Sequence, residues 1–532
     1  MSASIPATDT APGGAGATDP GDIPLLESKH TGLLMIALMA VTITQFLDAT
    51  IINVALKHME TDLTGAGPET ISWALTSFII AGVIGMPITS WLADRIGSRN
   101  LFIFATAGFL VTSMLCGAAT NLTQIVIFRA FQGLCTAFMG PLSQAVIFDI
   151  IPPNRQARAM GMWGLAVMIA PICGPTLGGY LTENLSWRWC FYVNLPIGLP
   201  ALAVLWWLLP SRPIRKRQLD LLGYFLIALA LASLQMILDR GQGKDWLQSG
   251  EIVTWLVIAL GGFWMFGVHS WRSKNPLFDP TLITNPNFLA SAAFMAALGV
   301  ANVALSATLP TMYQSLFGYS VIQTGYLMAP RGMAIMMMMP FTSYLVDRVD
   351  CRYLISAGYL ICSYSLWLMT GWSLEMGSDQ IIIASFVQGI GMGLLFVPMN
   401  VIAFSRLSPQ HRTEGTAVLN LTRNLGASFG ISVIVTLFSR NTQISHADIA
   451  ANVTSASIPT LDPASAADRF GSLGHAALAI LNGEITRQAA MIAYLDSFFM
   501  LVWLMLGIAI LPLLLKPVKT RAQQLKQHLA EA

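Results

Sequence analysis

The sequence predicts an all-α membrane protein in which fourteen transmembrane helices form two parallel six-helix halves with two extra helices between them. Only 11% of the 532 residues are charged and 55% are hydrophobic, whereas soluble domains are about 25% charged. Apolar runs long enough to cross about 30 Å of hydrocarbon recur along the chain. A short polar signature also appears twice, once in each half of the chain. These observations exclude a soluble enzyme and a nucleic-acid-binding protein.

Fourteen runs have the length and composition of a membrane-spanning helix. They lie at 32–56, 71–93, 101–119, 124–149, 157–182, 190–209, 221–238, 252–270, 288–314, 321–346, 353–372, 379–404, 413–438 and 490–515. Because the number is even, both chain ends are predicted on the same side of the membrane. Residues 1–28 have the composition of a disordered tail without a signal peptide, and residues 517–532 form a second tail.

The distribution of Lys and Arg predicts on which side of the membrane the two chain ends lie. Nineteen of the 29 basic residues fall in segments on the side of the chain ends, and seven fall in segments on the other side. Loops rich in Lys and Arg remain in the cytoplasm. Both termini are therefore expected to be cytoplasmic.

An internal repeat divides the chain. The segment SWLADRIGSR, residues 90–99, recurs as SYLVDRVDCR, residues 343–352, and Gln132 recurs as Gln388. Parallel repeats of this kind build transporters whose substrate site lies at the interface between the halves. The predicted halves are 29–210 and 281–516, the second including an outer loop at 440–489, and the inserted pair of helices occupies 211–280.

Asp48 is the first candidate functional residue. It lies in the segment LDATIINVAL inside the first apolar run, where a charged side chain costs about 2.5–3.5 kcal/mol or more. An acid at this depth usually faces a cavity or a partner, so we expect a functional role for Asp48. A proton entering from outside would weaken its hold on a cationic substrate or on a neighbouring polar group. The alternative is an acid near the outer interface that is merely hydrated or paired for folding.

Arg129 is the second candidate, because it lies about one and a half turns into the fourth run and cannot lose its proton. Its counterpart in the repeat is Ser385. An arginine in one half only predicts a functional role, such as holding a nearby carboxylate in its charged form or binding water. The alternative is a side chain that reaches back to the interface.

The repeated loop signature is the candidate cytoplasmic latch. A carboxylate there can accept hydrogen bonds from a helix N-terminus or an arginine of the other half, and its arginines can bind acidic groups or lipid. The alternative is an ordinary basic loop. The candidate residues are Asp94, Arg95, Arg99, Asp347 and Arg348.

The fifth run contains APICGPTLGG, whose prolines and glycines predict a bent helix that another backbone can approach closely. The candidate residues are Gly174, Pro175, Gly178 and Gly179; a packing role is the alternative. Further polar residues are candidates for the substrate pathway, with packing or interface roles as alternatives: Asn53, Gln132, Asn400, Arg423 and Asp496.

Methionines, including the run 336–339, are expected to line an adaptable apolar cavity, with helix packing as the alternative role for most of them. Neither the six cysteines nor the seven histidines show metal-ligand spacing, and no phosphate-binding loop or extramembrane catalytic domain is evident. We therefore predict no enzyme, no metal and no cofactor other than the proton-motive force.

These motifs carry a resemblance to a known family. Three motifs resemble signatures of the major facilitator superfamily: SWLADRIGSR, RAFQG and APICGPTLGG. Three others resemble segments of its fourteen-span drug:proton antiporters, and within them the EmrB type: LDATIINVAL, WRWCFYVNLPIG and LQMILDRGQGKDW. Two positions depart from the family pattern. Lys57 replaces a usual Pro, so the sequence does not determine where the first helix ends, and Ser90 replaces a usual Gly.

The resemblance implies multidrug:H⁺ antiport, in which hydrophobic or amphipathic compounds, often cations or uncouplers, leave the cytoplasm or inner leaflet of a bacterial inner membrane. It implies proton coupling at Asp48 and Arg129 and control of exchange direction at the Gly174-Pro175 bend. It also implies a periplasmic adaptor protein and an outer-membrane channel as partners. The polar outer segment at 440–489, which includes a helical stretch around 464–489, would be a docking site for the adaptor or else a mobile flap. The alternative function is a proton-coupled carrier for one metabolite on the same fold.

Overall fold

The regular elements in the computed structural model are all helices. It describes residue 26 and residues 30–63, 67–152, 155–212, 214, 218–405, 407–408, 411–453 and 472–515. Of the two predicted tails, 1–28 and 517–532, only residue 26 lies within this part of the chain. Thirteen of the described helices are long and apolar enough to cross a membrane, so the chain is a multi-pass membrane protein.

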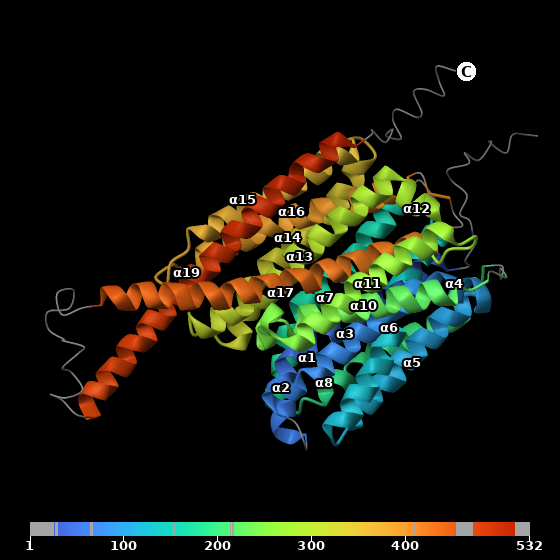
Figure 1. The fold of residues 1–532 in the computed structure, drawn as a ribbon. Helices are drawn as coiled ribbons and strands as arrows, with labels where there is room; N and C mark the ends of the chain where they lie inside the picture. Colours follow the sequence, from blue (N-terminus) through green and yellow to red (C-terminus); the bar gives the residue numbers. More distant parts are fainter. Residues whose placement is uncertain are drawn as a thin grey trace, which may run out of the picture.

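The first bundle contains the helices up to Leu208 (Figure 1). They are α1 (Thr31–Asp62), α2 (Pro68–Ile71), α3 (Trp73–Gly85), η2 (Met86–Ile88), α4 (Thr89–Ile96), α5 (Ser98–Ala118), α6 (Leu122–Ile150), α7 (Gln156–Asn184), α8 (Trp189–Tyr192) and α9 (Asn194–Leu208). An inserted pair follows, consisting of α10 (Leu221–Arg240) and α11 (Gly250–Arg272) joined by η4 (Gln242–Lys244) and η5 (Trp246–Gln248).

The second bundle begins after this pair. It consists of α12 (Pro280–Thr284), α13 (Pro286–Ser315), α14 (Val321–Val346), α15 (Cys351–Thr370), α16 (Ser378–Phe404), α17 (Arg412–Asn452), α19 (Ser472–Ile510) and η7 (Leu511–Leu514). The helix α14 is not among the thirteen apolar spans, but its 26 residues reach about 39 Å and pack along α7 and α16. It therefore supplies the fourteenth predicted crossing.

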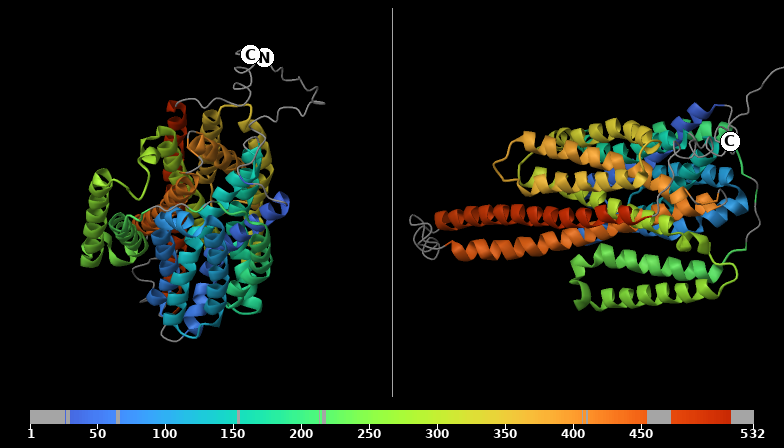
Figure 2. Two further views of the ribbon diagram at one scale, coloured as in Figure 1. Left: turned by 90° about the vertical axis from the view of Figure 1, so that its right-hand side faces the viewer. Right: turned by 90° about the horizontal axis from the view of Figure 1, so that it is seen from above.

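We use the name terminal face for the side on which α1 begins and η7 ends. Successive long helices cross between this face and the opposite face, as the views in Figure 1 and Figure 2 show. The helix α1 passes through Lys57 and ends only at Asp62, six residues beyond the predicted end, because Lys57 keeps the backbone N–H that a proline would remove. Its end is held by Trp187, whose Nε1 donates to Asp62 at 2.9 Å.

Two helices extend well beyond the bundle on the opposite face. The helix α17 has 41 residues and α19 has 39, whereas about 20 residues cross a bilayer. Both project past the other helices as an antiparallel pair (Figure 2). The predicted outer loop at 440–489 is therefore largely helical and continuous with the two spans. The helix expected at 464–489 is described from Ser472 onward, and residues 454–471 lie outside the described part.

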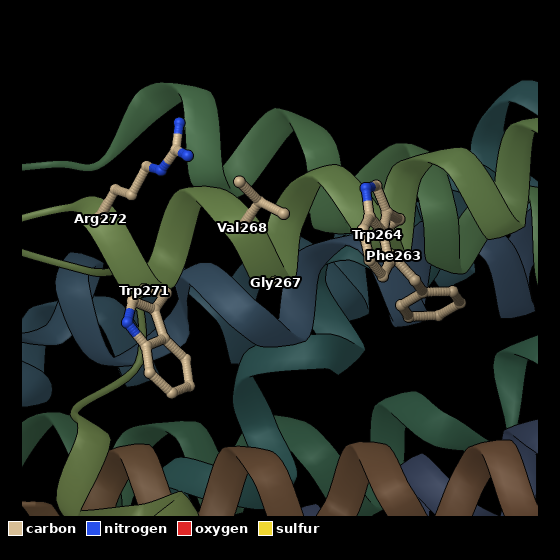
Figure 3. A pocket seen from close by; sticks show the side chains of 6 residues that line it. All are labelled: Phe263, Trp264, Gly267, Val268, Trp271 and Arg272. Carbon is tan, nitrogen blue, oxygen red and sulfur yellow. The ribbon is translucent and has the colours of Figure 1, made fainter.

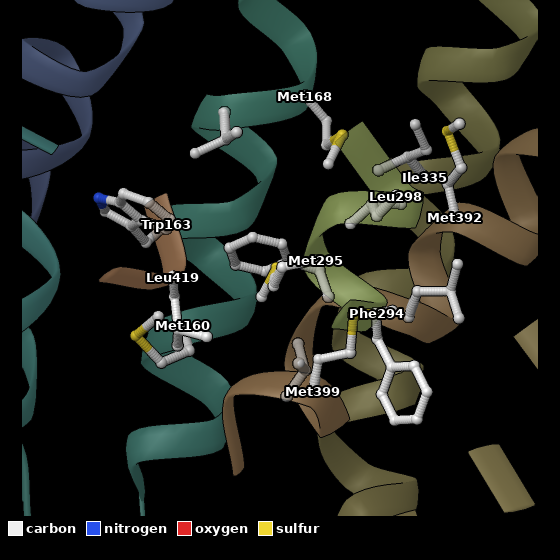
Figure 4. Packing of buried hydrophobic residues seen from close by; sticks show 14 of the residues in the cluster. Met160, Trp163, Met168, Phe294, Met295, Leu298, Ile335, Met392, Met399 and Leu419 are labelled. Carbon is white, nitrogen blue, oxygen red and sulfur yellow. The ribbon is translucent and has the colours of Figure 1, made fainter. Parts of the chain in front are cut away.

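The two bundles meet along two seams. The helix α7 packs against α14, and α17 packs against α6 and the η2–α4 segment. Between the seams lies a cluster of buried apolar side chains with many methionines, including Met160 and Met168 of α7, Met295 of α13 and Met399 of α16 (Figure 4). Because a helix turns 100° per residue, the run 336–339 is divided. Met339 is buried at this interface, while Met336 and Met337 are exposed on the outside of the bundle.

Candidate functional site

Asp48 lies fully buried in the first bundle and receives three hydrogen bonds. Arg129 Nη1 of α6 donates to Oδ2 at 2.6 Å. Gln132 Nε2, one turn further along α6, donates to Oδ1 at 3.0 Å, and Asn194 Nδ2 at the start of α9 donates to the same oxygen at 2.9 Å. Neither Asp48 nor Arg129 has any exposed side-chain surface. The arrangement is a charged pair with two neutral amide donors that satisfy the remaining carboxylate lone pairs.

Arg129 is held from several helices. Its Nε donates to the backbone carbonyl of Ala74 in α3 at 3.1 Å, and its Nη1 also donates to Gln132 Oε1 at 2.9 Å. The Phe78 ring lies 4.0 Å from the guanidinium carbon, a cation–π distance. Among the described residues no group accepts from its Nη2. The buried Nη2 of Arg129 thus has no acceptor among the described residues, and the guanidinium keeps its charge. This favours a site that rearranges during function.

Glycines bring the surrounding helices close enough for these contacts. A Cβ at Gly133 of α6 would lie 2.1 Å from the carbonyl oxygen of Phe78, and a Cβ at Gly174 of α7 would lie 2.2 Å from Thr50 Oγ1 of α1. Gly178 touches Ile51 of α1 in the same way. The predicted motif in the fifth run therefore places α7 directly on the segment of α1 that carries Asp48. The helix α7 is helical throughout Gln156–Asn184, and the predicted bend at Pro175 remains a prediction.

A second polar cluster joins the two bundles. Gln144 Nε2 of α6 donates to Asn400 Oδ1 of α16 at 2.8 Å, and Asn420 Nδ2 of α17 donates to Gln144 Oε1 at 2.9 Å. Arg423 donates to Asn420 Oδ1 at 2.9 Å and lies 5.1 Å from the ring of Phe46 in α1. The structure thus brings the predicted residues Asn400 and Arg423 together. Sequence reasoning missed Gln144 and Asn420, although each is an amide within an apolar run.

The terminal face is closed by contacts that join α6 and the segment after α9 to α16 and α17. Asp149 at the end of α6 forms a two-pronged ion pair with Arg212, which also donates to Thr413 Oγ1 of α17 at 2.9 Å. Arg412 Nη1 donates to the carbonyl of Phe148 at 2.9 Å, and the rings of Phe148 and Phe404 are 4.7 Å apart. The sequence analysis did not propose Asp149, Arg212 or Arg412 as functional. The position of Asp149 at the end of an apolar run was the available signal.

The predicted latch residues lie beside this closure. Arg99 Nη2 donates to the carbonyl of Trp206 at 2.5 Å, near the end of α9, and Arg352 Nη1 donates to the carbonyl of Leu515 at 2.8 Å, just after η7. Each signature therefore binds the last helix of its own half. Arg348 stacks on Tyr344 at 4.2 Å, and Arg95 is exposed. Asp94 and Asp347 both have interaction partners, and the latch role of all five residues remains a prediction.

Two remaining candidates lie apart from the buried pair. Asn53 is exposed on the part of α1 nearer the opposite face. Asp496 is exposed and accepts a hydrogen bond from Asn441 at 3.0 Å, which places it between the projecting helices α17 and α19. The part of the chain that the structure describes contains no cluster of metal-ligating side chains.

A shallow apolar hollow lies on the outer side of α11, lined by Phe263, Trp264, Gly267, Val268, Trp271 and Arg272 (Figure 3). All six residues come from one helix, and Trp271 is 92% exposed. On a membrane span such a surface faces lipid. It is separate from the polar groups described above, so it does not mark the transport site.

Two helical bundles that meet around polar and methionine-rich surfaces, with a buried ion pair in one bundle, define a polytopic membrane transporter. A family profile supports this class: the profile of the Major Facilitator Superfamily matches residues 38–431. The chain belongs to the Major Facilitator Superfamily and is a transporter rather than an enzyme. The predicted family and fold are thereby confirmed.

The chain is also similar to individual transport and resistance proteins. The chain is 30% identical over 482 residues to the multidrug export protein EmrB of Escherichia coli, covering 89% of this chain and 93% of the relative. It is 31% identical over 484 residues to the fatty acid resistance protein FarB of Neisseria gonorrhoeae, covering 90% and 94%. The human organic anion transporter MFSD10 (TETRAN) shares the fold, with a TM-score of 0.53 at 14% identity over 89% of this chain and 98% of that one.

Proposed function

We propose that this protein is a proton-driven exporter of lipophilic compounds in a bacterial inner membrane, with both termini in the cytoplasm. The observation that carries the proposal is the fully buried pair of Asp48 and Arg129. The similarity to EmrB, a multidrug export protein, supports lipophilic drugs as the substrates. The basic residues of the terminal-face segments support the cytoplasmic placement of that face.

Proton coupling would work through the ion pair itself. A proton that reaches Asp48 removes its negative charge, while Arg129 keeps its positive charge and needs a new acceptor. Both Arg129 and Gln144 belong to α6, and Gln144 binds the second bundle, so a rearrangement of α6 reaches the interface. One charge moving through the membrane potential supplies about 2.3 kcal/mol per 100 mV. That is comparable with a hydrogen bond to a charged group, about 1.5–3 kcal/mol.

The sequence left two binding partners open for the Asp48 carboxylate, a cationic substrate and a neighbouring polar group. We propose that the partner is the polar group, Arg129. The three hydrogen-bond donors to the Asp48 carboxylate belong to its own bundle, and its side chain has no exposed surface. A cationic substrate would therefore have no direct access to it in this conformation. Protonation would act on Arg129 and, through Arg129, on the helices.

The conformation fits a cycle of alternating access. The contacts of Asp149, Arg212, Arg412 and Gln144 hold the bundles together toward the terminal face. If that face is cytoplasmic, this conformation is closed toward the cytoplasm. Opening it requires these bonds to break, which gives the coupling step a defined set of contacts to act upon.

The charges inside the second bundle favour lipophilic anions among the substrates. Arg331 is 2% exposed, and its Nη2 donates to Asn302 Oδ1 at 2.6 Å. Arg423 binds an amide in the cluster between the bundles. No carboxylate of the described residues lies within ion-pair distance of either guanidinium, so both leave a positive potential near the interface. FarB, a fatty acid resistance protein, is a relative consistent with this charge.

A periplasmic adaptor and an outer-membrane channel complete the proposal. The pair formed by α17 and α19 projects from the opposite face, where an adaptor could bind it (Figure 2). Deleting residues 450–485 is expected to remove the chain from an adaptor pull-down while leaving the fourteen crossings in place. Retention of the adaptor at wild-type level would contradict the docking role.

The decisive experiment is a proton-flux assay in proteoliposomes. Purified protein is tested with lipophilic cations, lipophilic anions and neutral drugs, and proton movement is recorded with a pH-sensitive dye as each compound is added. The proposal requires flux with several unrelated lipophilic compounds and none in liposomes without protein. Flux with a single polar metabolite would instead favour the alternative, a proton-coupled carrier for that metabolite.

A further inference from the structure

The inserted pair of helices has no counterpart in the repeat, and its contacts indicate what it does. The helix α11 has little buried surface and packs mainly on α10. The helix α10 in turn packs on α3 of the first bundle and also touches α17 of the second (Figure 2). The strongest connection of the pair to the rest of the protein is therefore the contact between α10 and α3.

Two consecutive charged residues at the end of α10 hold the start of α3. Asp239 accepts a hydrogen bond from Thr76 Oγ1. The guanidinium of Arg240 lies 5.3 Å from the ring of Trp73, and its Nη1 is fixed at 2.6 Å by Glu251 of α11. Thr76 is only 4% exposed, so its bond to Asp239 is largely shielded from solvent on the Thr76 side.

The residues held in this way flank the group that positions Arg129. Ala74 lies between Trp73 and Thr76, and its carbonyl accepts from Arg129 Nε at 3.1 Å. Phe78, half a turn beyond Thr76, presents its ring to the guanidinium at 4.0 Å. The backbone of Phe78 touches Gly133 of α6 so closely that a Cβ there would lie 2.1 Å from its oxygen. A displacement of this part of α3 would therefore be transmitted to Arg129 and to α6.

We propose that Asp239 is a positioning residue for proton coupling: by binding Thr76 it fixes the start of α3, which supplies the carbonyl and the aromatic ring that orient Arg129. The inserted pair then serves to hold the coupling arginine in place. This inference rests on the proposed proton-driven transport. It requires no contact between Asp239 and substrate.

The test is a double-mutant cycle between Asp239 and Thr76 in proteoliposomes. Asp239→Leu and Thr76→Val each remove the hydrogen bond, while Asp239→Asn retains an acceptor oxygen. Weaker support for Arg129 makes its pairing with Asp48 weaker, so the ion pair is easier for a proton to break. We expect the pH of half-maximal transport to rise by about half a unit in each single variant, since the lost support is part of one hydrogen bond to a charged group. The double variant should shift no further, and Asp239→Asn should stay close to wild type.

Ser233→Ala is the matched control, because Ser233 is a buried polar residue of α10 that bonds only to its own helix, at Leu229. It should leave the pH profile unchanged. Size-exclusion chromatography selects folded protein, and Thr76→Val tests the contact independently if Asp239→Leu fails to fold. Shifts that add in the double variant, or a wild-type profile in both single variants, would overturn the inference. Failure of the proposed function is distinguishable, because wild-type protein would then show no substrate-dependent proton flux at any pH.

Discussion

The Asp48 carboxylate and the Arg129 guanidinium form an ion pair of 2.6 Å in which neither side chain is exposed. The pair joins α1 to α6, and Gln132 and Asn194 add donors from α6 and α9. A buried pair of this kind contributes little net stability, but removing one partner leaves an unpaired buried charge. The pair is thus suited to a switch that a proton operates.

Asp48→Asn is expected to abolish proton-driven transport while the protein still inserts and folds. The amide has the size of the protonated carboxyl, and Arg129 keeps its bonds to Ala74 and Gln132. Transport driven by an imposed pH gradient should fall to the level of empty liposomes. Asp379→Asn is the control, because Asp379 is exposed in the first turn of α16. Wild-type rates for Asp48→Asn would remove the ion pair from the mechanism.

Arg129→Ala is expected to destabilise the folded protein by about 3–5 kcal/mol, because Asp48 is then buried without a counter-charge. Arg129→Lys keeps the charge, but its single ammonium lacks the planar fork with which Arg129 reaches Asp48 and the Ala74 carbonyl from separate nitrogens. This variant should therefore fold better than Arg129→Ala and transport slowly. Unfolding in detergent, followed by circular dichroism, measures the difference. Equal stability of wild type and Arg129→Ala would show that the charge of Asp48 is satisfied elsewhere.

Gly174→Ala is expected to impair transport by forcing α7 away from α1 beside Asp48. The added Cβ would lie 2.2 Å from Thr50 Oγ1 and 3.3 Å from the backbone nitrogen of Ile51, so the helices must separate. Overpacking of this kind costs about 1–3 kcal/mol. Gly261→Ala in α11 is the matched control, since a Cβ there meets nothing within 4 Å. Melting temperature and transport rate are measured for both, and equal behaviour of the two variants would contradict the close contact.

Arg212→Gln is expected to open the terminal face. The substitution removes the ion pair with Asp149 and weakens the bond to Thr413 across the interface. Spin labels at the exposed positions Asn100 of α5 and Tyr353 of α15, introduced without the native cysteines, report the distance between the bundles. The distribution should gain a longer component in Arg212→Gln. Arg158→Gln, at an exposed position near the start of α7, should leave the distribution as in wild type.

Arg423→Gln is expected to reduce the transport of lipophilic anions more than that of lipophilic cations. The variant removes a positive charge beside Asn420 and Phe46 while keeping a side chain that can donate a hydrogen bond. Competition between a labelled anion and a labelled cation in proteoliposomes measures the preference. An unchanged ratio would exclude Arg423 from substrate selection.

The motifs and apolar runs of the sequence predicted the transporter family and the membrane-spanning fold, and they marked Asp48 and Arg129 as functional candidates. Asn194 was not predicted, although it lies within the motif WRWCFYVNLPIG. A helix at 464–489 was predicted, but its continuity with the last crossing was not, and neither was the extension of α17 beyond residue 438. Polar residues end an apolar run without ending a helix, and α17 contains no proline that would interrupt its backbone hydrogen bonds.

The positions of the membrane crossings and of the charges inside them were determined by the sequence alone, since hydrocarbon acts on each stretch of chain independently of its neighbours. The pairing of those charges was decided by the tertiary structure. The partners of Asp48 are 81, 84 and 146 residues away, and their distance depends on how each helix is rotated and packed. The same holds for the contact between Asp239 and Thr76, 163 residues apart, which only the packing of α10 on α3 creates.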